Sequence, residues 1–172
     1  MKLDARVRYT RRVIQEALLT LLEQKPLNKI TVTELCALAQ INRATFYAHY
    51  ADCYAVLNAL EDGLLRAFEN SLSASAGGME VQDLMEAVYR IMDENSQVCR
   101  VEQKDRALAE RMIAIARYKT RTLWRASLPK ATEGEIDMLF TCLANGLLQV
   151  ILTGYGKYPR EQIAAFASAM TR

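Results

Sequence analysis

Residues that form tight turns are scarce in this 172-residue sequence, which has seven glycines and three prolines. An all-β fold needs such residues between its strands, so their scarcity argues against that class. About half of the residues are apolar, which is enough to bury a sizeable core. Because the apolar residues recur at helical spacing, we expect an all-α fold of about nine helices.

Clusters that bind metals or catalyse reactions are also missing. The sequence has one histidine, and its four cysteines lie far apart without a C-x-x-C pair, which excludes an ordinary zinc site. Paired acids, a glycine-rich phosphate loop and an activated serine are not found at the spacings that catalysis requires. We therefore expect a protein that is not an enzyme and that holds no cofactor.

Long apolar runs are the third absence. The N-terminal sequence MKLDARVRYTRR lacks the apolar core of a signal peptide. Elsewhere no apolar run approaches the ~18 residues that cross a membrane. These features predict a soluble, cytoplasmic protein with reduced cysteines and no membrane partner.

Positive charge is concentrated near the N-terminus, although the whole chain carries only +2. Residues 1–50 hold eight Lys or Arg against four acids, and the rest holds fourteen against sixteen. The attractive field for a polyanion is therefore at the N-terminal end, unless these residues only form a solvated face. Four arginines near the start either reach a phosphate or a minor groove or belong to a loose tail: Arg6, Arg8, Arg11 and Arg12.

The segment TVTELCALAQINRATFYAHY has the pattern of a helix-turn-helix. Thr31 and Glu34 form a capping box that starts a first helix, and Asn42 is a good N-cap for a second. Phe46 and Tyr50 lie four residues apart and mark the buried face of that second helix. The predicted DNA-binding residues are Thr31, Asn42, Arg43, Ala44, Thr45, Tyr47 and His49.

These residues suit the surface of double-stranded DNA. Arg43 can donate to guanine, and Ala44 and Thr45 can contact a thymine methyl group. Thr45, Tyr47 and His49 can hydrogen-bond to phosphates, which fixes the protein on the DNA backbone. The alternative is an ordinary helical hairpin whose tyrosines only pack against their neighbours.

The residues from about 12 to 57 resemble the N-terminal domain of TetR-family transcriptional regulators. The resemblance is carried by RRVIQEALLTLLEQKPLNKITV and TELCALAQINRATFYAHYADCYAVL, and is most specific from Ala39 to Tyr50. It implies that Thr45, Tyr47 and His49 contact DNA. One departure is Cys53, where the family usually has a lysine. A missing phosphate contact predicts weaker binding at every sequence.

Residues 1–52 are predicted to form the DNA-binding domain, and residues 53–172 a helical bundle for ligand binding and dimerisation. Within the bundle, the apolar pattern predicts one helix over Val81–Glu94 and another over about 105–127. Six residues either line a ligand pocket between bundle helices or belong to ordinary core: Tyr89, Met92, Cys99, Met112, Tyr118 and Trp124.

The last two helices, within about residues 134–171, are predicted to form a homodimer interface. Thr132 and Glu135 make a second capping box, and the helix that follows is apolar around much more than the ~100° of a surface helix. Its own core can cover only one side, so a two-fold, four-helix interface would cover the other. The TetR resemblance implies the same arrangement. A monomeric core in which the final helix covers its predecessor is the alternative.

Together these features predict a homodimeric transcriptional regulator, most often a repressor in such families, that binds a palindromic operator. A small-molecule effector bound in the bundle would change the separation of the reading helices. The alternative is a TetR-like co-activator or adaptor that binds a protein instead of DNA, and Cys53 motivates it.

Overall fold

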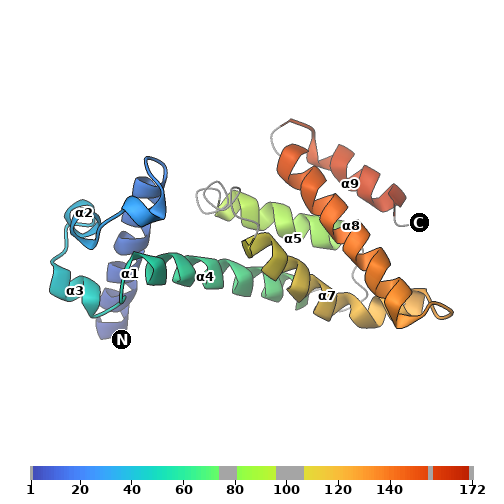
Figure 1. The fold of residues 1–172 in the computed structure, drawn as a ribbon, viewed down its shortest axis with the longest axis horizontal. Coiled ribbons are helices and arrows are strands. Elements are labelled where there is room, and N and C mark those ends of the chain that lie inside the picture. Colours follow the sequence, from blue (N-terminus) through green and yellow to red (C-terminus); the bar gives the residue numbers. More distant parts are fainter. Residues whose placement is uncertain (1, 74–80, 96–106, 155–156, 171–172) are drawn as a thin grey trace. The chain divides into compact units, whose positions relative to one another are not determined.

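The computed structural model describes residues 2–73, 81–95, 107–154 and 157–170. These ranges contain eight α-helices and one short 3₁₀ helix, without a strand among them (Figure 1). The prediction of an all-α fold is confirmed.

The described residues divide into two compact units, of which the first ends at Leu64 and the second begins at Leu65. The division falls inside α4 (Cys53–Ser73), because the first turns of this helix pack into the core of the first unit. The domain boundary predicted from the sequence lies at the start of α4, about three turns earlier.

The first unit consists of α1, the 3₁₀ helix η1, α2, α3 and the start of α4. A single apolar core holds these short elements together, and Ile14, Leu18, Leu35, Phe46 and Val56 are fully buried in it. Helices of one or two turns are not stable alone, so this core determines where α2 and α3 lie. The helices have the bounds Lys2–Leu22 (α1), Leu27–Lys29 (η1), Val32–Leu38 (α2) and Arg43–Tyr47 (α3).

The second unit is a bundle formed by the rest of α4 with α5 (Val81–Glu94), α7 (Ala107–Ser127), α8 (Glu133–Gly154) and α9 (Arg160–Met170). The predicted capping box starts α8, where the Glu135 carboxylate accepts from the Thr132 N–H at 2.7 Å. In return, the Thr132 hydroxyl accepts from the Glu135 N–H at 3.2 Å.

The final helix, α9, is attached to α5 and α8 by specific contacts. Arg160 donates to both carboxylate oxygens of Asp93 on α5, at 2.7 and 2.6 Å, and its guanidinium lies 5.3 Å from the centre of the Tyr89 ring. A Cβ atom added to Gly154 would lie 2.9 Å from Ile163 Cδ1. Glycine at this position therefore allows α9 to pack closely against the end of α8.

The sequence predicted that no apolar run is long enough to cross a membrane, and helix α8 corrects this expectation. Its residues Glu133–Ile151 have a mean hydropathy of 1.2, and only 17% of them are buried. By length and composition this segment could cross a membrane, because its charged residues all stand in its first turns. The same composition fits a helix that packs against another protein surface.

Candidate nucleic-acid interface

The turn between α2 and α3 ends one helix and sets the direction of the next. Gln40 has a φ of 54°, and its N–H donates to the Ala37 carbonyl at 3.3 Å. The Ile41 N–H donates to the Cys36 carbonyl at 3.0 Å, which completes a Schellman motif. The left-handed conformation costs a non-glycine residue about 1–2 kcal/mol. Packing of Ile41 against the core helps to hold the turn.

The start of α2 is fixed by the predicted capping box. The Thr31 hydroxyl accepts from the Glu34 N–H at 3.2 Å, while the Glu34 carboxylate accepts from the Thr31 N–H at 3.0 Å. Lys25 donates to the same carboxylate at 2.6 Å. The hydrogen bond from Lys25, followed by those from Thr31, lowers the pKa of Glu34 from 4.5 to about 2. Glu34 therefore stays ionised over the physiological pH range.

The start of α3 is capped as the sequence predicted, and its inner face is anchored. Asn42 Oδ1 accepts from the Thr45 N–H at 2.7 Å. Phe46 is fully buried, and the largely buried Tyr50 accepts a hydrogen bond from Gln15 of α1 at 3.2 Å. These contacts fix the rotation of α3 about its axis, so that the same residues stay on its outer side.

The outer side of α3 and its N-cap carry four of the seven predicted DNA-binding residues. Asn42, Arg43, Ala44 and Tyr47 are exposed. The Arg43 guanidinium lies 5.8 Å from the centre of the Tyr47 ring and donates to its hydroxyl at 3.4 Å. These two side chains therefore share one face, one helical turn apart.

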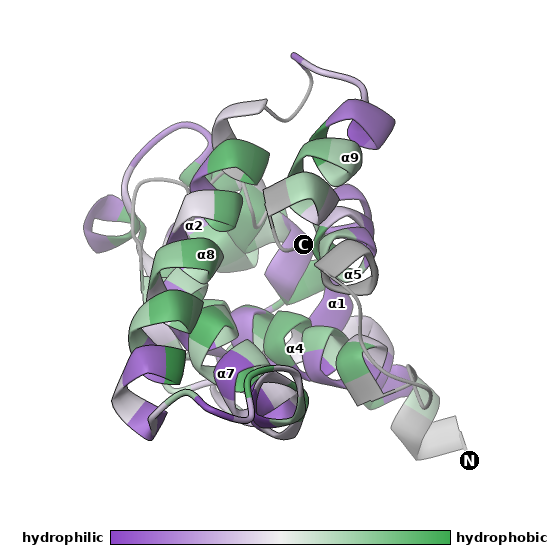
Figure 2. Cartoon of the chain, turned by 90° about the vertical axis from the view of Figure 1, so that its right-hand side faces the viewer, coloured by the Kyte–Doolittle hydropathy of each residue, from purple (hydrophilic) through white to green (hydrophobic). Residues whose placement is uncertain are grey.

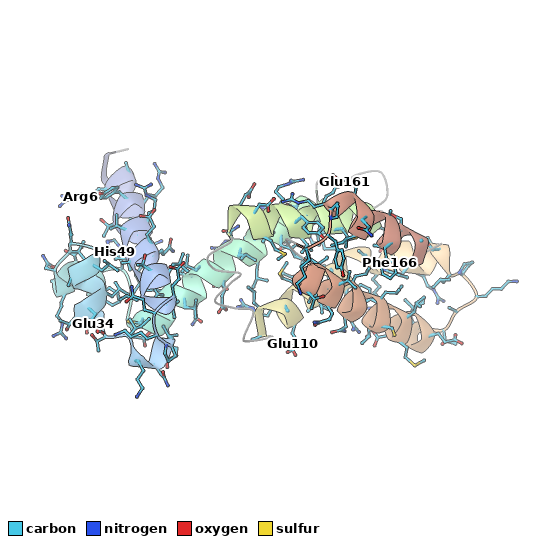
Figure 3. All side chains as sticks on the ribbon, turned by 90° about the horizontal axis from the view of Figure 1, so that it is seen from above. Arg6, Glu34, His49, Glu110, Glu161 and Phe166 are labelled. Atoms are coloured by element: carbon cyan, nitrogen blue, oxygen red, sulfur yellow. The ribbon has the colours of Figure 1, made fainter. Side chains whose placement is uncertain are left out.

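Thr45 and His49 are half-buried at the edges of this face, and Figure 3 shows His49 on the first unit. Thr31 is exposed at the start of α2, where its hydroxyl is already used in the capping box. If Thr31 contacts a phosphate, it does so in addition to capping α2. The structure thus brings the α3 residues together, and Thr31 lies on the preceding helix.

Tyr54 is a candidate contact residue that sequence reasoning missed. Asp52 caps α4 by accepting from the Ala55 N–H at 2.8 Å, and Cys53 is buried. The next residue, Tyr54, is 53% exposed and carries a hydroxyl that can donate to a phosphate. Its aromatic type, two residues after the cap, was the available signal. The sequence alone does not tell which of these neighbours faces the core.

The arginines near the N-terminus belong to a helix, since α1 begins at Lys2, and a loose tail is therefore excluded for the described part. Arg6, Arg8, Arg11 and Arg12 are all exposed. Arg12 lies 5.6 Å from the centre of the Tyr9 ring and 3.8 Å from a Glu16 oxygen. Figure 3 shows Arg6 on this helix.

The predicted ligand-binding residues that the structure describes do not line one pocket together. Met112 lines a cavity of about 50 Å³ inside the bundle, whereas Tyr118 and Trp124 line a groove of about 700 Å³ between α7 and α8. Six helical positions separate Met112 from Tyr118, which puts them on different faces of α7. Tyr89 and Met92 are buried on α5. Cys99 lies outside the described residues.

Comparisons with known proteins reveal the fold. No family model and no curated protein matches the chain. Among solved structures, a TetR transcriptional regulator from Streptococcus agalactiae 2603V is similar, with a TM-score of 0.70 and 20% identity over 99% of this chain and 97% of that one. A proposed transcriptional regulator from Pseudomonas aeruginosa PAO1 has a TM-score of 0.63 and 16% identity, over 94% of this chain and 88% of that one.

The TetR family transcriptional regulator PfmR from Thermus thermophilus has a TM-score of 0.59 and 15% identity, over 92% of this chain and 94% of that one. The likeness in each case extends over nearly the whole of both chains. The chain therefore has the fold of TetR transcriptional regulators, as the resemblance of its N-terminal residues suggested.

Proposed function

We propose that this chain, which has the TetR fold, is a DNA-binding transcriptional regulator. The observation that carries the proposal is the construction of α3. Its inner face is anchored by the buried Phe46, its start is capped by Asn42, and its outer side exposes Arg43, Ala44 and Tyr47. A short helix with this arrangement suits the major groove, where the first residues of a reading helix contact base edges.

The residues of α3 would have two kinds of role. Arg43 would donate to a guanine, and Ala44 and Thr45 would contact a thymine methyl group. Tyr47 and His49 would bind phosphates, with Thr31 at the start of α2. Because Arg43 stacks on Tyr47 in the free protein, its guanidinium is partly oriented before DNA arrives.

The regulator would act in the cytoplasm as a homodimer. Residues 134–171 of two copies would pack as four helices, covering Met138, Leu139 and Phe166, which a single chain leaves exposed. Two reading helices about 34–36 Å apart would then enter successive major grooves of a palindromic operator. In this proposal residues 1–52 read DNA, and residues 53–172 dimerise and bind an effector. The protein would repress transcription while it is bound to the operator, and binding of the effector would release it from the DNA.

Fluorescence anisotropy on DNA selected from random sequence tests the proposal. Arg43→Ala should relax the preference for one base pair by about 1–3 kcal/mol, whereas Tyr47→Phe should weaken binding to every sequence alike. Tyr118→Phe is the matched control, because Tyr118 is exposed on α7 of the other unit. If both α3 variants bind as the parent does, the assigned roles are wrong.

A co-activator or adaptor that binds a protein is the second candidate. It is favoured by Cys53, which is buried at the position where TetR-like regulators usually carry a lysine. The adaptor does not need phosphate contacts, so it would not bind DNA even at low salt. Tight, salt-dependent binding to duplex DNA would exclude it.

A further inference from the structure

The first turns of α1 contribute nothing to the core of the first unit. From residue 5 to residue 13 no residue is buried, and the buried residues of this helix begin at Ile14. Figure 3 shows this end of α1, where Arg6 is labelled, projecting from the rest of the unit. Most helices in proteins are stabilised by packing of one face, so turns without a core beneath them are available to a partner outside the chain.

The charges on these turns are all positive. Residues 5–13 include four arginines and no acidic residue. Arg12 lies 3.8 Å from a carboxylate oxygen of Glu16, the first acidic residue that follows, so its charge is partly compensated within the helix. Such a density of guanidinium groups suits a polyanion, and DNA is the polyanion proposed for α3 of the same unit. The four arginines are all exposed: Arg6, Arg8, Arg11 and Arg12.

Arg11 stands next to the end of α3. Gln15 of α1 donates to the hydroxyl of Tyr50, which follows α3, at 3.2 Å. Arg11 lies four residues before Gln15 and therefore on the same side of α1. Burial raises the pKa of Tyr50, and the positive charge of Arg11 counteracts part of this rise, so the guanidinium lies near the hydroxyl. The side of α1 that carries Arg11 thus adjoins α3.

Arg8 continues the same side of α1, whereas Arg6 does not. Arg8 lies three residues before Arg11 and seven before Gln15, so it extends this side by one more turn away from the core. Arg6 lies nine residues before Gln15, and with 3.6 residues per turn this places it on the opposite side of the helix. Arg8 and Arg11 therefore form a pair beside α3, and Arg6 carries the same charge on the far side.

We propose that Arg8 and Arg11 bind phosphates of the DNA backbone beside the base pairs that α3 reads. The inference rests on the proposed function and extends its interface from α3 to α1. An α-helix is about 10–12 Å wide and the minor groove about 6 Å, so α1 itself does not enter that groove. A guanidinium can donate two parallel hydrogen bonds to one phosphate. Because phosphates carry no sequence information, the pair adds affinity and fixes the orientation of the unit on the duplex.

The salt dependence of binding to duplex DNA selected from random sequence tests these contacts. Each phosphate contact contributes about 0.9 to the slope of log affinity against log salt concentration. Two copies of the chain each lose one contact in Arg11→Gln, so the slope should become shallower by about 1.8. The advantage of the parent over this variant should then shrink about twelvefold between about 50 and 200 mM salt. Arg11→Lys keeps the charge and should retain the slope of the parent.

Arg6→Gln is the matched control, because it removes the same charge from the opposite side of the same helix. It should retain the slope of the parent. Equal changes in Arg6→Gln and Arg11→Gln would reveal an effect of net charge alone, and an unchanged slope in folded Arg11→Gln would mean that no contact exists. Either result overturns the proposal. If Arg11→Gln fails to fold in a urea titration, Arg8→Gln tests the same pair one turn further from the core.

Neutral methylphosphonates, placed one at a time in the flanks of the selected site, locate the contacts. The parent should lose affinity at the flanking phosphate that Arg11 binds. Arg11→Gln should lose nothing further there, because its contact is already absent. Independent losses at every flanking position would show that Arg11 has no partner phosphate, and the proposal would be wrong.

Two further results separate this inference from its alternatives. Exchanging A·T for G·C pairs in the flanks should not alter the difference between the parent and Arg11→Gln. A difference that depends on these pairs would mean that Arg11 reads bases in the minor groove, which contradicts a backbone contact. A parent protein that binds no duplex refutes the proposed function itself. A parent that binds DNA with the same slope as Arg8→Gln and Arg11→Gln refutes only the contacts of α1.

Discussion

The outer faces of α3 and α8 expose different chemistry. α3 presents Arg43, Tyr47 and the side chain of Asn42, which can donate and accept hydrogen bonds. α8 presents Met138 and Leu139, which are 67% and 39% exposed, and it is coloured as hydrophobic over most of its length in Figure 2. A polar face suits nucleic acid, and a contiguous apolar face suits another protein surface. The contrast is the one that the proposed function requires, with DNA on the face of α3 and a second copy of the chain on the face of α8.

The two helices also depend on different interactions. α3 has five residues, too few for a stable helix, so the core beneath it must hold it in place. α8 has 22 residues and buries few of them within its own chain. We therefore expect α3 to be most sensitive to changes in its buried face, and α8 and α9 to changes in their exposed faces.

The largest expected effect is that of Phe46→Ala in the core beneath α3. Phe46 is fully buried, and removing a buried phenylalanine ring typically costs about 3–5 kcal/mol of unfolding free energy. Urea denaturation measures it. Tyr47→Ala, at the neighbouring exposed position, should cost under about 1 kcal/mol. Similar losses for both variants would contradict the view that the buried face of α3 contributes more to stability than its exposed face.

The exposed face of α9 should be sensitive to charge. Phe166 is 48% exposed in the single chain, and Figure 3 shows it on α9. Phe166→Asp would bury an unpaired carboxylate in the proposed dimer, so its association constant should fall at least about 100-fold. Sedimentation equilibrium measures this change, with Tyr118→Asp on α7 as the control. If the parent protein is itself monomeric in this measurement, the proposed interface is refuted.

The capping box of α2 should contribute less. Thr31→Ala removes the hydroxyl that accepts from the Glu34 N–H and should cost about 1 kcal/mol of unfolding free energy. Thr31→Ser keeps the hydroxyl and should retain most of that stability. The lower stability of Thr31→Ala reduces the amount of folded protein, which lowers the apparent DNA affinity. If the affinity falls by more than this, Thr31 also contacts the DNA backbone.

Acid should remove the contribution of Glu34 over a defined pH range. The pKa of Glu34 is lowered from 4.5 to about 2, because Lys25 and Thr31 donate to the ionised carboxylate. The stabilisation is therefore complete above pH 4.5 and is lost as the pH falls towards 2. Because Glu34 is exposed, solvent and salt reduce the effect. The difference in unfolding free energy between the parent and Glu34→Gln should shrink as the pH falls across this range. A constant difference would mean that Lys25 and Thr31 do not cause the shift in the pKa of Glu34.

Features that depend on local sequence could be predicted. The capping boxes at Thr31 and Thr132 each use residues three positions apart, and both occur in the structure. The helix predicted over Val81–Glu94 has those bounds, since its apolar pattern repeats clearly. The buried position of Phe46 also followed from its spacing to Tyr50.

Features that depend on packing between distant residues could not be predicted. Nothing local indicated that Cys53 would be buried and Tyr54 exposed, because this depends on the side of α4 that meets the core. The proposed ligand residues were chosen by type, although Met112 and Tyr118 lie on different faces of α7. The roles of the α3 residues in DNA binding remain predictions.

The turn at Gln40 gives the smallest expected effect and the sharpest test of how α3 is held. Gln40→Gly removes the cost of a left-handed φ, but glycine also gains freedom in the unfolded chain. The net result should be a stabilisation below about 1 kcal/mol. Gln40→Val should destabilise, because a branched side chain fits this conformation worse than glutamine does. Urea midpoints that order glycine, glutamine and valine in any other way would mean that the core tolerates a different turn. In that case the Schellman bonds from Gln40 and Ile41 would not determine the direction of α3.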